Sequence, residues 1–191
     1  IITDLTSLHR MWFNDVSTVT IVPTQVAYDL AVLNGLPKQK VRTIGIPVNT
    51  AIANETRPPS ELRAELGWQT DITTLLFVGS KRTRQIADVL RVLNHSALPL
   101  QLCIVAGGDD ELYPTLRATD WHHPAHVYNL VDNMPMMLHA ADAIVCKAGG
   151  LIVSEALACG LPILLTDVIE GQETGNAEYV VENGAGVRVN E

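Results

Sequence analysis

The sequence of 191 residues is poor in charged and aromatic side chains. Charged residues make up 18% and aromatic residues 5%, against 47% hydrophobic residues. An ordinary globular domain has about 25% charged residues, so this composition excludes disorder and predicts a packed core. The 13 lysines and arginines are outnumbered by 21 aspartates and glutamates, which gives a net charge of −8. This balance argues against a nucleic-acid-binding surface and gives no support to electrostatic attraction of this stretch to an anionic membrane.

Cysteines and long apolar runs are also scarce. Cys103, Cys146 and Cys159 lie far apart in apolar surroundings without zinc-ligand spacing, so we expect reduced core thiols in a reducing compartment. The apolar runs 100–106 and 162–166 are much shorter than the ~18 residues that span a bilayer. No signal peptide is recognisable after Ile1, and we expect the sequence to be a piece of a longer protein.

Short β-rich runs alternate with amphipathic stretches over most of the length. We expect strands at 17–22, 41–46, 73–78, 100–106, 127–131, 143–146, 163–166 and 186–189, and helices at 24–34, 59–66, 82–95, 111–119, 134–140, 151–158 and 173–182. This order predicts an α/β fold, a doubly wound, Rossmann-like, mostly parallel sheet with right-handed crossovers. The polar segment 49–59 is expected to be a linker or an exposed excursion, with Ser60 as the next N-cap and Gly67 as the helix stop. Ligands of such folds bind at the carboxyl ends of the strands.

A Gly-Gly turn separates one of these strands from its helix. Gly149 and Gly150 follow the strand, and the free N–H groups of a helix start suit an anion such as a diphosphate. Glu155 follows about one helical turn later and can accept hydrogen bonds from vicinal hydroxyls. The pattern indicates a nucleotide site, but a plain turn with a solvent-facing glutamate fits the spacing equally well.

Two further loops follow strand ends. Gln172, Glu173 and Asn176 offer amide and carboxylate groups for sugar hydroxyls, or only a hydrophilic helix cap. Gly79-Ser80 is followed by Lys81, Arg82 and Arg84, which could meet phosphate or form a solvated first turn. This loop matches neither a G-x-G-x-x-G dinucleotide motif nor a P-loop.

No metal site or nucleophile is expected. His122, His123 and His126 have no supporting cysteine or carboxylate and are interpreted as a surface loop. Ser154 lies within a helix and has no evident base partner, and no nucleophile elbow is present.

Ordered motifs along almost the whole chain resemble the donor-binding half of GT-B glycosyltransferases. The branch is that of monogalactosyldiacylglycerol synthase, processive diacylglycerol glucosyltransferases and the peptidoglycan N-acetylglucosaminyltransferase. The matching motifs are Thr3-Asp4 with His9-Arg10-Met11-Trp12-Phe13, Val22-Pro23-Thr24, Gly45-Ile46-Pro47-Val48, Lys147-Ala148-Gly149 with Glu155-Ala156 and Gly160-Leu161-Pro162, and Gly171-Gln172-Glu173 with Asn176 and Asn183-Gly184-Ala185-Gly186.

The resemblance implies a UDP-sugar donor, used as a substrate with no cofactor, and inversion at the anomeric carbon. By position in the family's motifs, Glu155 would hold the ribose, and Gly149 and Gly150 would lie beside the diphosphate. The remaining implied positions are Gly79 and Ser80 in the first donor loop, the Val131 backbone at uracil, Gln172, Glu173 and Asn176 at the sugar or diphosphate, and His9 near the interdomain cleft.

The resemblance also implies how the chain is divided into domains and which molecules the full-length protein contacts. Residues 1–46 would be the end of an N-terminal domain with a hinge, and residues 47–191 the nucleotide-sugar-binding domain. The catalytic base and a lipid acceptor such as diacylglycerol would belong to a preceding domain, which would contact the inner face of the membrane from the cytoplasm. The family's glycine-rich donor loop is replaced here by 81–84. A UDP-sugar 2-epimerase on the same fold and a non-catalytic nucleotide-binding or interaction module are the alternatives.

Overall fold

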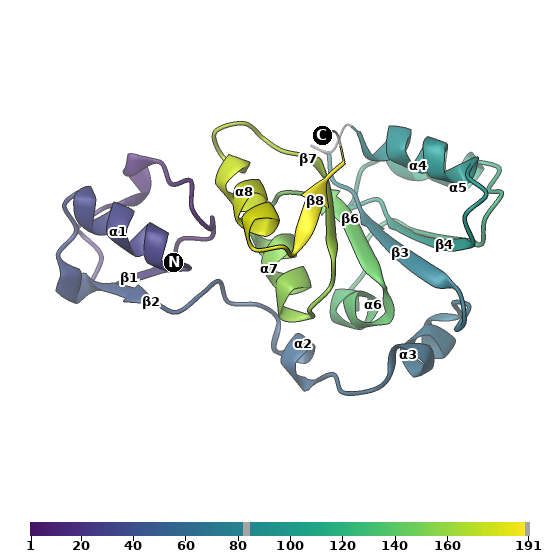
Figure 1. The fold of residues 1–191 in the computed structure, drawn as a ribbon, viewed down its shortest axis with the longest axis horizontal. Helices are drawn as coiled ribbons and strands as arrows, with labels where there is room; N and C mark the ends of the chain where they lie inside the picture. Colours follow the sequence, from purple (N-terminus) through teal and green to yellow (C-terminus); the bar gives the residue numbers. More distant parts are fainter. Residues whose placement is uncertain (82–84, 190–191) are drawn as a thin grey trace.

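The computed structural model describes residues 1–81 and 85–189 and confirms the doubly wound α/β architecture (Figure 1). A six-stranded parallel sheet has the order β5-β4-β3-β6-β7-β8, and a separate two-stranded parallel sheet consists of β1 and β2. The strands are β1 Thr20–Val22, β2 Val41–Thr43, β3 Thr73–Val78, β4 Leu100–Val105, β5 Ala125–Tyr128, β6 Ala143–Lys147, β7 Ile163–Asp167 and β8 Gly186–Arg188. The helices are α1 Gln25–Leu33, α2 Thr50–Asn54, α3 Pro59–Leu66, α4 Ile86–Asn94, α5 Leu112–Ala118, α6 Met134–Ala140, α7 Gly150–Ala158 and α8 Thr174–Glu182, with short 3-10 helices at Arg10–Trp12 and Lys38–Lys40.

The strand order reverses direction between β3 and β6. The chain runs outward from β3 through β4 to β5, and then returns to place β6 on the other side of β3. All six residues of β4 are buried, as expected for a parallel strand covered on both faces. The loops after β3 and β6 therefore meet at the switch point, where doubly wound folds bind ligands.

Successive residues of the strands contribute their side chains alternately to two hydrophobic cores, one on each face of the sheet. Leu76, Cys103 and Ile144 pack on the face covered by α3, α6, α7 and α8. Phe77 and Leu102 pack on the opposite face, against α4 and α5. The cysteines are free thiols, and burial raises the pKa of Cys146 to about 12 and of the half-buried Cys159 to about 11.

The segment predicted as a linker contains a helix instead. Asn49 caps α2 by accepting a hydrogen bond from the Ala51 N–H at 2.9 Å, and Ile52 is buried in the main core. Helix α3 begins at Pro59, as predicted, because a proline without an N–H fits the first helical position, but its N-cap is Pro58 and not Ser60. Gly67 ends α3 with a φ of +71°, as expected.

Three strands differ from their predicted bounds by two residues or more. Residues 17–19 and 44–46 are not in strands, and β5 begins two residues earlier than predicted, at Ala125. The predicted start of α4 falls on residues 82–84, outside the described part of the chain. No helix of the described residues is long and apolar enough to cross a bilayer.

The small sheet packs with α1 and has its own apolar cluster of Ile2, Val22, Ala27, Ala31, Leu36 and Val41. Figure 1 shows this unit on one side of the larger one, and the chain leaves it after β2 on the way to α2. The segment 2–7 starts beside β1, where the Ile2 N–H donates to the Ile21 carbonyl at 2.9 Å. The proposed division of the chain after residue 46 stays a prediction.

Tyr128→Phe tests the packing around β5. The indole Nε1–H of Trp68, a residue only 3% exposed, donates to the Tyr128 hydroxyl at 2.8 Å. Removing this acceptor leaves a buried donor unsatisfied, so we expect the free energy of unfolding to fall by about 1–2 kcal/mol. Urea denaturation measures the loss, and Tyr113→Phe in α5 is the matched control. Equal stability of Tyr128→Phe and the parent protein would contradict the prediction.

Candidate functional site

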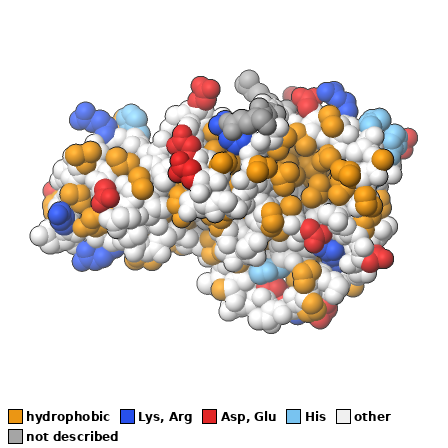
Figure 2. All heavy atoms as spheres, viewed as in Figure 1, with side chains coloured by type: hydrophobic (Ala, Val, Ile, Leu, Met, Phe, Trp, Pro, Cys, Tyr) orange, Lys and Arg blue, Asp and Glu red, His pale blue; other side chains and the backbone are white. Residues whose placement is uncertain are grey.

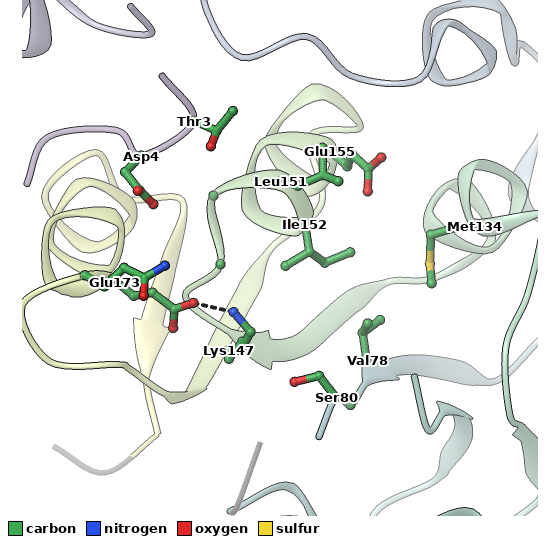
Figure 3. Close-up of a pocket in the computed structure, with 14 residues that line it drawn as sticks. Thr3, Asp4, Val78, Ser80, Met134, Lys147, Leu151, Ile152, Glu155 and Glu173 are labelled. Atoms are coloured by element: carbon green, nitrogen blue, oxygen red, sulfur yellow. Dashed lines mark hydrogen bonds and ion pairs between the residues drawn. The ribbon is translucent and has the colours of Figure 1, made fainter. Parts of the chain in front are cut away.

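A cavity of about 430 Å³ lies at the switch point of the sheet (Figure 3). Its lining joins the ends of β3 and β6 to the start of α7, the loop before α8 and the N-terminal segment. The lining residues are Thr3, Asp4, Val78, Gly79, Ser80, Met134, Lys147, Gly149, Gly150, Leu151, Ile152, Glu155, Gln172 and Glu173. Seven residues singled out from the sequence are thus brought together: Gly79, Ser80, Gly149, Gly150, Glu155, Gln172 and Glu173.

The floor of the cavity includes the start of α7. Strand β6 ends at Lys147, its register against β7 shifts there, and Gly149 serves as the N-cap in an extended conformation. Gly149 has no side chain to cap the helix, and the first-turn N–H groups have no acceptor within the helix. This helix start can therefore donate hydrogen bonds to an anion.

The N-terminal segment forms a wall of the cavity beside the start of α7. This contact was not predicted from the sequence. A Cβ on Gly150 would lie 1.8 Å from the Thr3 carbonyl oxygen, and one on Gly175 would lie 2.3 Å from the Ser7 nitrogen. These two positions need glycine because the segment 3–7 runs against the starts of α7 and α8. Thr3 and Asp4 were recognised only as part of a family motif, and no local pattern indicates that they reach this cavity.

Asn176 holds that segment in place and does not line the cavity. Its Oδ1 accepts from the Leu5 N–H at 2.6 Å, and its Nδ2 donates to Asp4 Oδ1 at 3.1 Å and to the Ala148 carbonyl at 3.0 Å. The side chain is fully buried. The position predicted to face a sugar is therefore occupied by a buried amide that joins three segments of the chain.

Two other predicted residues lie outside the lining. Val131 is partly buried against the main core, in the loop before α6. His9 is exposed and caps the first 3-10 helix by accepting from the Met11 N–H at 3.3 Å.

Glu155 and the Lys147–Glu173 pair lie at opposite ends of the cavity. In Figure 3, Glu155 points from α7 to the side where Met134 lies, while Lys147 and Glu173 lie on the side of Asp4. Partial burial raises the pKa of the Glu155 carboxyl above its ordinary value. Lys147 Nζ donates to Glu173 Oε1, and Glu173 Oε2 accepts from the Ile169 N–H at 3.2 Å.

The residues after β3 are divided between the cavity and the surface. Gly79 and Ser80 line the cavity, but Lys81 pairs with Asp110 at 3.2 Å on an exposed loop. Arg82 and Arg84, which were candidates for phosphate contacts, lie outside the described residues.

The histidines singled out from the sequence are not in the lining of this cavity. His126 is on β5, not on a surface loop, with its ring 6.2 Å from that of Trp68. In the described part of the chain, no cluster of His, Cys, Asp and Glu could hold a metal ion.

An apolar hollow of about 320 Å³ lies between α4 and α5, where Figure 2 shows hydrophobic side chains gathered on the surface. Ser154 donates to the Gly150 carbonyl at 2.7 Å, within its own helix.

Comparison with known proteins identifies the family. The sequence model of the glycosyltransferase family 28 C-terminal domain matches residues 73–191, from the start of β3 to the end of the chain. The chain belongs to this glycosyltransferase family. A second model, that of monogalactosyldiacylglycerol (MGDG) synthase, matches residues 1–48, which include the small sheet.

A curated relative agrees with both matches. The probable chloroplastic monogalactosyldiacylglycerol synthase of Glycine max is 34% identical over 194 residues, covering 97% of this chain and 37% of the relative. The family 28 chain thus spans little more than a third of that relative's length.

Solved structures show the same fold. The glycotransferase of kitacinnamycin matches 91% of this chain and 42% of its own, with a TM-score of 0.59 and 21% identity. The S. aureus MnaA–UDP co-structure matches 89% and 47%, with a TM-score of 0.62 and 17% identity. The predicted fold class, the C-terminal half of a GT-B fold, is confirmed.

Proposed function

We propose that this chain binds the UDP-sugar donor of an inverting glycosyltransferase that transfers a hexose to a lipid acceptor such as diacylglycerol. The observation that carries the proposal is that residues of both sequence motifs line one cavity at the switch point. Gly149 and Gly150 place a helix start there, and Glu155, Gln172 and Glu173 flank it.

The order of groups along the cavity fits such a donor. Glu155, which lines the Met134 end, would accept hydrogen bonds from the two ribose hydroxyls. The helix start at Gly149 and Gly150 suits the diphosphate. The sugar then lies toward Gln172 and the Asp4 wall, where polar groups from both units are available.

The relatives support this substrate class. The curated relative described above is named as a monogalactosyldiacylglycerol synthase, and the MnaA neighbour was solved with UDP. Because the chain spans 37% of that relative, we propose that the catalytic base and the lipid-binding groove come from the rest of the full-length protein. Peripheral contact with a membrane, through that part of the protein, belongs to the same proposal.

The direct test uses the full-length protein that contains this chain. It is incubated with a UDP-hexose and diacylglycerol vesicles, and the products are separated by chromatography and identified by mass spectrometry. We expect a hexosyl-diacylglycerol and UDP in equal amounts. Release of an epimerised sugar would show a UDP-sugar 2-epimerase instead. A well-folded protein that shows no turnover of the UDP-hexose and does not bind UDP at millimolar concentration would support the alternative of a non-catalytic module.

The pH dependence of nucleoside binding tests Glu155. Partial burial raises its pKa, so the carboxyl stays protonated to a higher pH than an exposed glutamate. Only the carboxylate accepts hydrogen bonds from both ribose hydroxyls, so we expect the affinity for uridine to rise with pH through this raised pKa. Uridine is the probe because, unlike UDP, it has no phosphate that titrates. Titration calorimetry on the parent protein and Glu155→Gln measures it, and an equal pH dependence of both would contradict the assignment.

A further inference from the structure

We propose that Lys147 is a catalytic residue of this site, whose ammonium binds the donor diphosphate and stabilises the negative charge that develops as the diphosphate leaves. Glu173 is its positioning residue. The inference rests on the proposed function and assigns the cation that the transfer of a sugar from a diphosphate requires.

The charges around the cavity single out Lys147. Among the described residues of the lining, the carboxylates are Asp4, Glu155 and Glu173, and the one basic side chain is Lys147. A diphosphate in this cavity would be repelled by the carboxylates without a nearby cation. Lys81, two residues beyond Gly79, is paired with Asp110 on an exposed loop and is not in the lining.

The backbone places the ammonium beside the start of α7. Lys147 is the last residue of β6, and a Cβ on Gly149 would lie 2.7 Å from Lys147 Nζ. Glycine at position 149 therefore leaves the space that the ammonium occupies. The cation and the first-turn N–H groups of α7 can act on the same anion because they lie next to each other.

The pair with Glu173 orients the ammonium without using all its donors. An ammonium has three N–H groups, and only one is needed for Glu173 Oε1. The Lys147 side chain is 21% exposed, whereas that of Glu173 is 3% exposed. Glu173 Oε2 accepts from the Ile169 N–H at 3.2 Å, so each oxygen of the carboxylate has a hydrogen-bond donor. The remaining donors of Lys147 are thus available to a phosphate oxygen.

The transfer reaction explains why we expect Lys147 to affect kcat more than binding of the donor. The acceptor hydroxyl oxygen forms a bond to the anomeric carbon, and its proton passes to a general base of the full-length protein. The bond from the anomeric carbon to the β-phosphate oxygen breaks, and its electron pair stays on that oxygen. The diphosphate gains negative charge in this step, so the ammonium binds the transition state more strongly than the bound donor.

The experiment measures turnover and ligand binding of the full-length protein with Lys147→Met. We expect kcat to fall by about 100-fold with a change of a few-fold in the KM for the UDP-sugar. The inhibition constant of UDP is expected to rise about 10-fold, while uridine binding is unchanged, because uridine has no diphosphate. Glu173→Gln is expected to lower kcat by a smaller factor, because its lysine is retained but less well oriented.

Two further variants make the result decisive. Lys147→Met leaves the buried Glu173 carboxylate without its cation. The double variant Lys147→Met/Glu173→Gln removes that unpaired charge. It therefore reports on catalysis even if the single variant folds poorly. Lys40→Met, which removes an exposed lysine paired with Asp15 beside the small sheet, is the matched control and is expected to keep full activity. The inference is overturned if the double variant keeps kcat within threefold of a parent protein that turns over. If the parent protein shows no UDP-dependent turnover, the proposed function fails, and this inference fails with it.

Discussion

Glu155→Ala is expected to weaken binding of UDP and UDP-sugars by about 100-fold, since two hydrogen bonds to a carboxylate are lost. The half-buried carboxyl of Glu155 lines the cavity one helical turn after Gly150, at the end opposite Lys147. Because the Glu155 carboxyl forms no hydrogen bond or ion pair with another described residue, the variant should keep its stability within about 0.5 kcal/mol. Titration calorimetry measures the affinity, and thermal unfolding checks the fold.

The matched control is Glu178→Ala, which removes an exposed glutamate of α8 outside the cavity. It changes the net charge by the same amount, so a general electrostatic effect would appear in both variants. We expect its affinity for UDP to equal that of the parent protein. Equal losses in the two variants, or no loss with Glu155→Ala, would remove Glu155 from the proposed ribose site.

Asn176→Ala is expected to lower the free energy of unfolding by about 3 kcal/mol. The change leaves the Leu5 N–H and the Ala148 carbonyl without the buried amide that they bond at 2.6 Å and 3.0 Å. It also removes the bond to Asp4, so the segment 3–7 loses two hydrogen bonds to the larger unit. We therefore expect weaker UDP-sugar binding as well, because Thr3 and Asp4 form one wall of the cavity.

Asn183→Ala, at the opposite end of α8, serves as the control. Its amide is exposed and donates to the Tyr179 carbonyl at 2.8 Å, and its loss should cost about 0.5 kcal/mol or less. Urea denaturation of both variants gives the comparison. A loss for Asn176→Ala no larger than that for Asn183→Ala would show that the amide is not the tie between the two units.

The turn at Gly149 and Gly150 shows how far local patterns predict a site. The Gly-Gly turn and the glutamate one turn later predict a helix start next to a carboxylate, and the structure has both at one cavity. These features follow from helix geometry, which depends on near neighbours in the chain. The same reasoning placed Asn176 at a ligand, because spacing along the chain does not state which side chain turns inward.

Elements that depend on long-range packing were predicted less well. The segment 49–59 is polar enough to suggest a linker, but burial of Ile52 against the main core stabilises α2. Lys147 was part of a family motif without a role of its own, because its pairing with Glu173 joins residues 26 positions apart.

The alternation of apolar runs and amphipathic stretches was enough to determine the doubly wound α/β fold, and the Gly149 and Glu155 motif was enough to locate the helix start that faces its switch point. Both are local patterns, repeated within a few residues along the chain. The tertiary structure decided that Asp4 and Lys147 line the cavity and that Asn176 holds the N-terminal segment in place. These roles depend on segments up to 172 positions apart, as for Asp4 and Asn176, and contacts of that kind arise only when the whole chain packs.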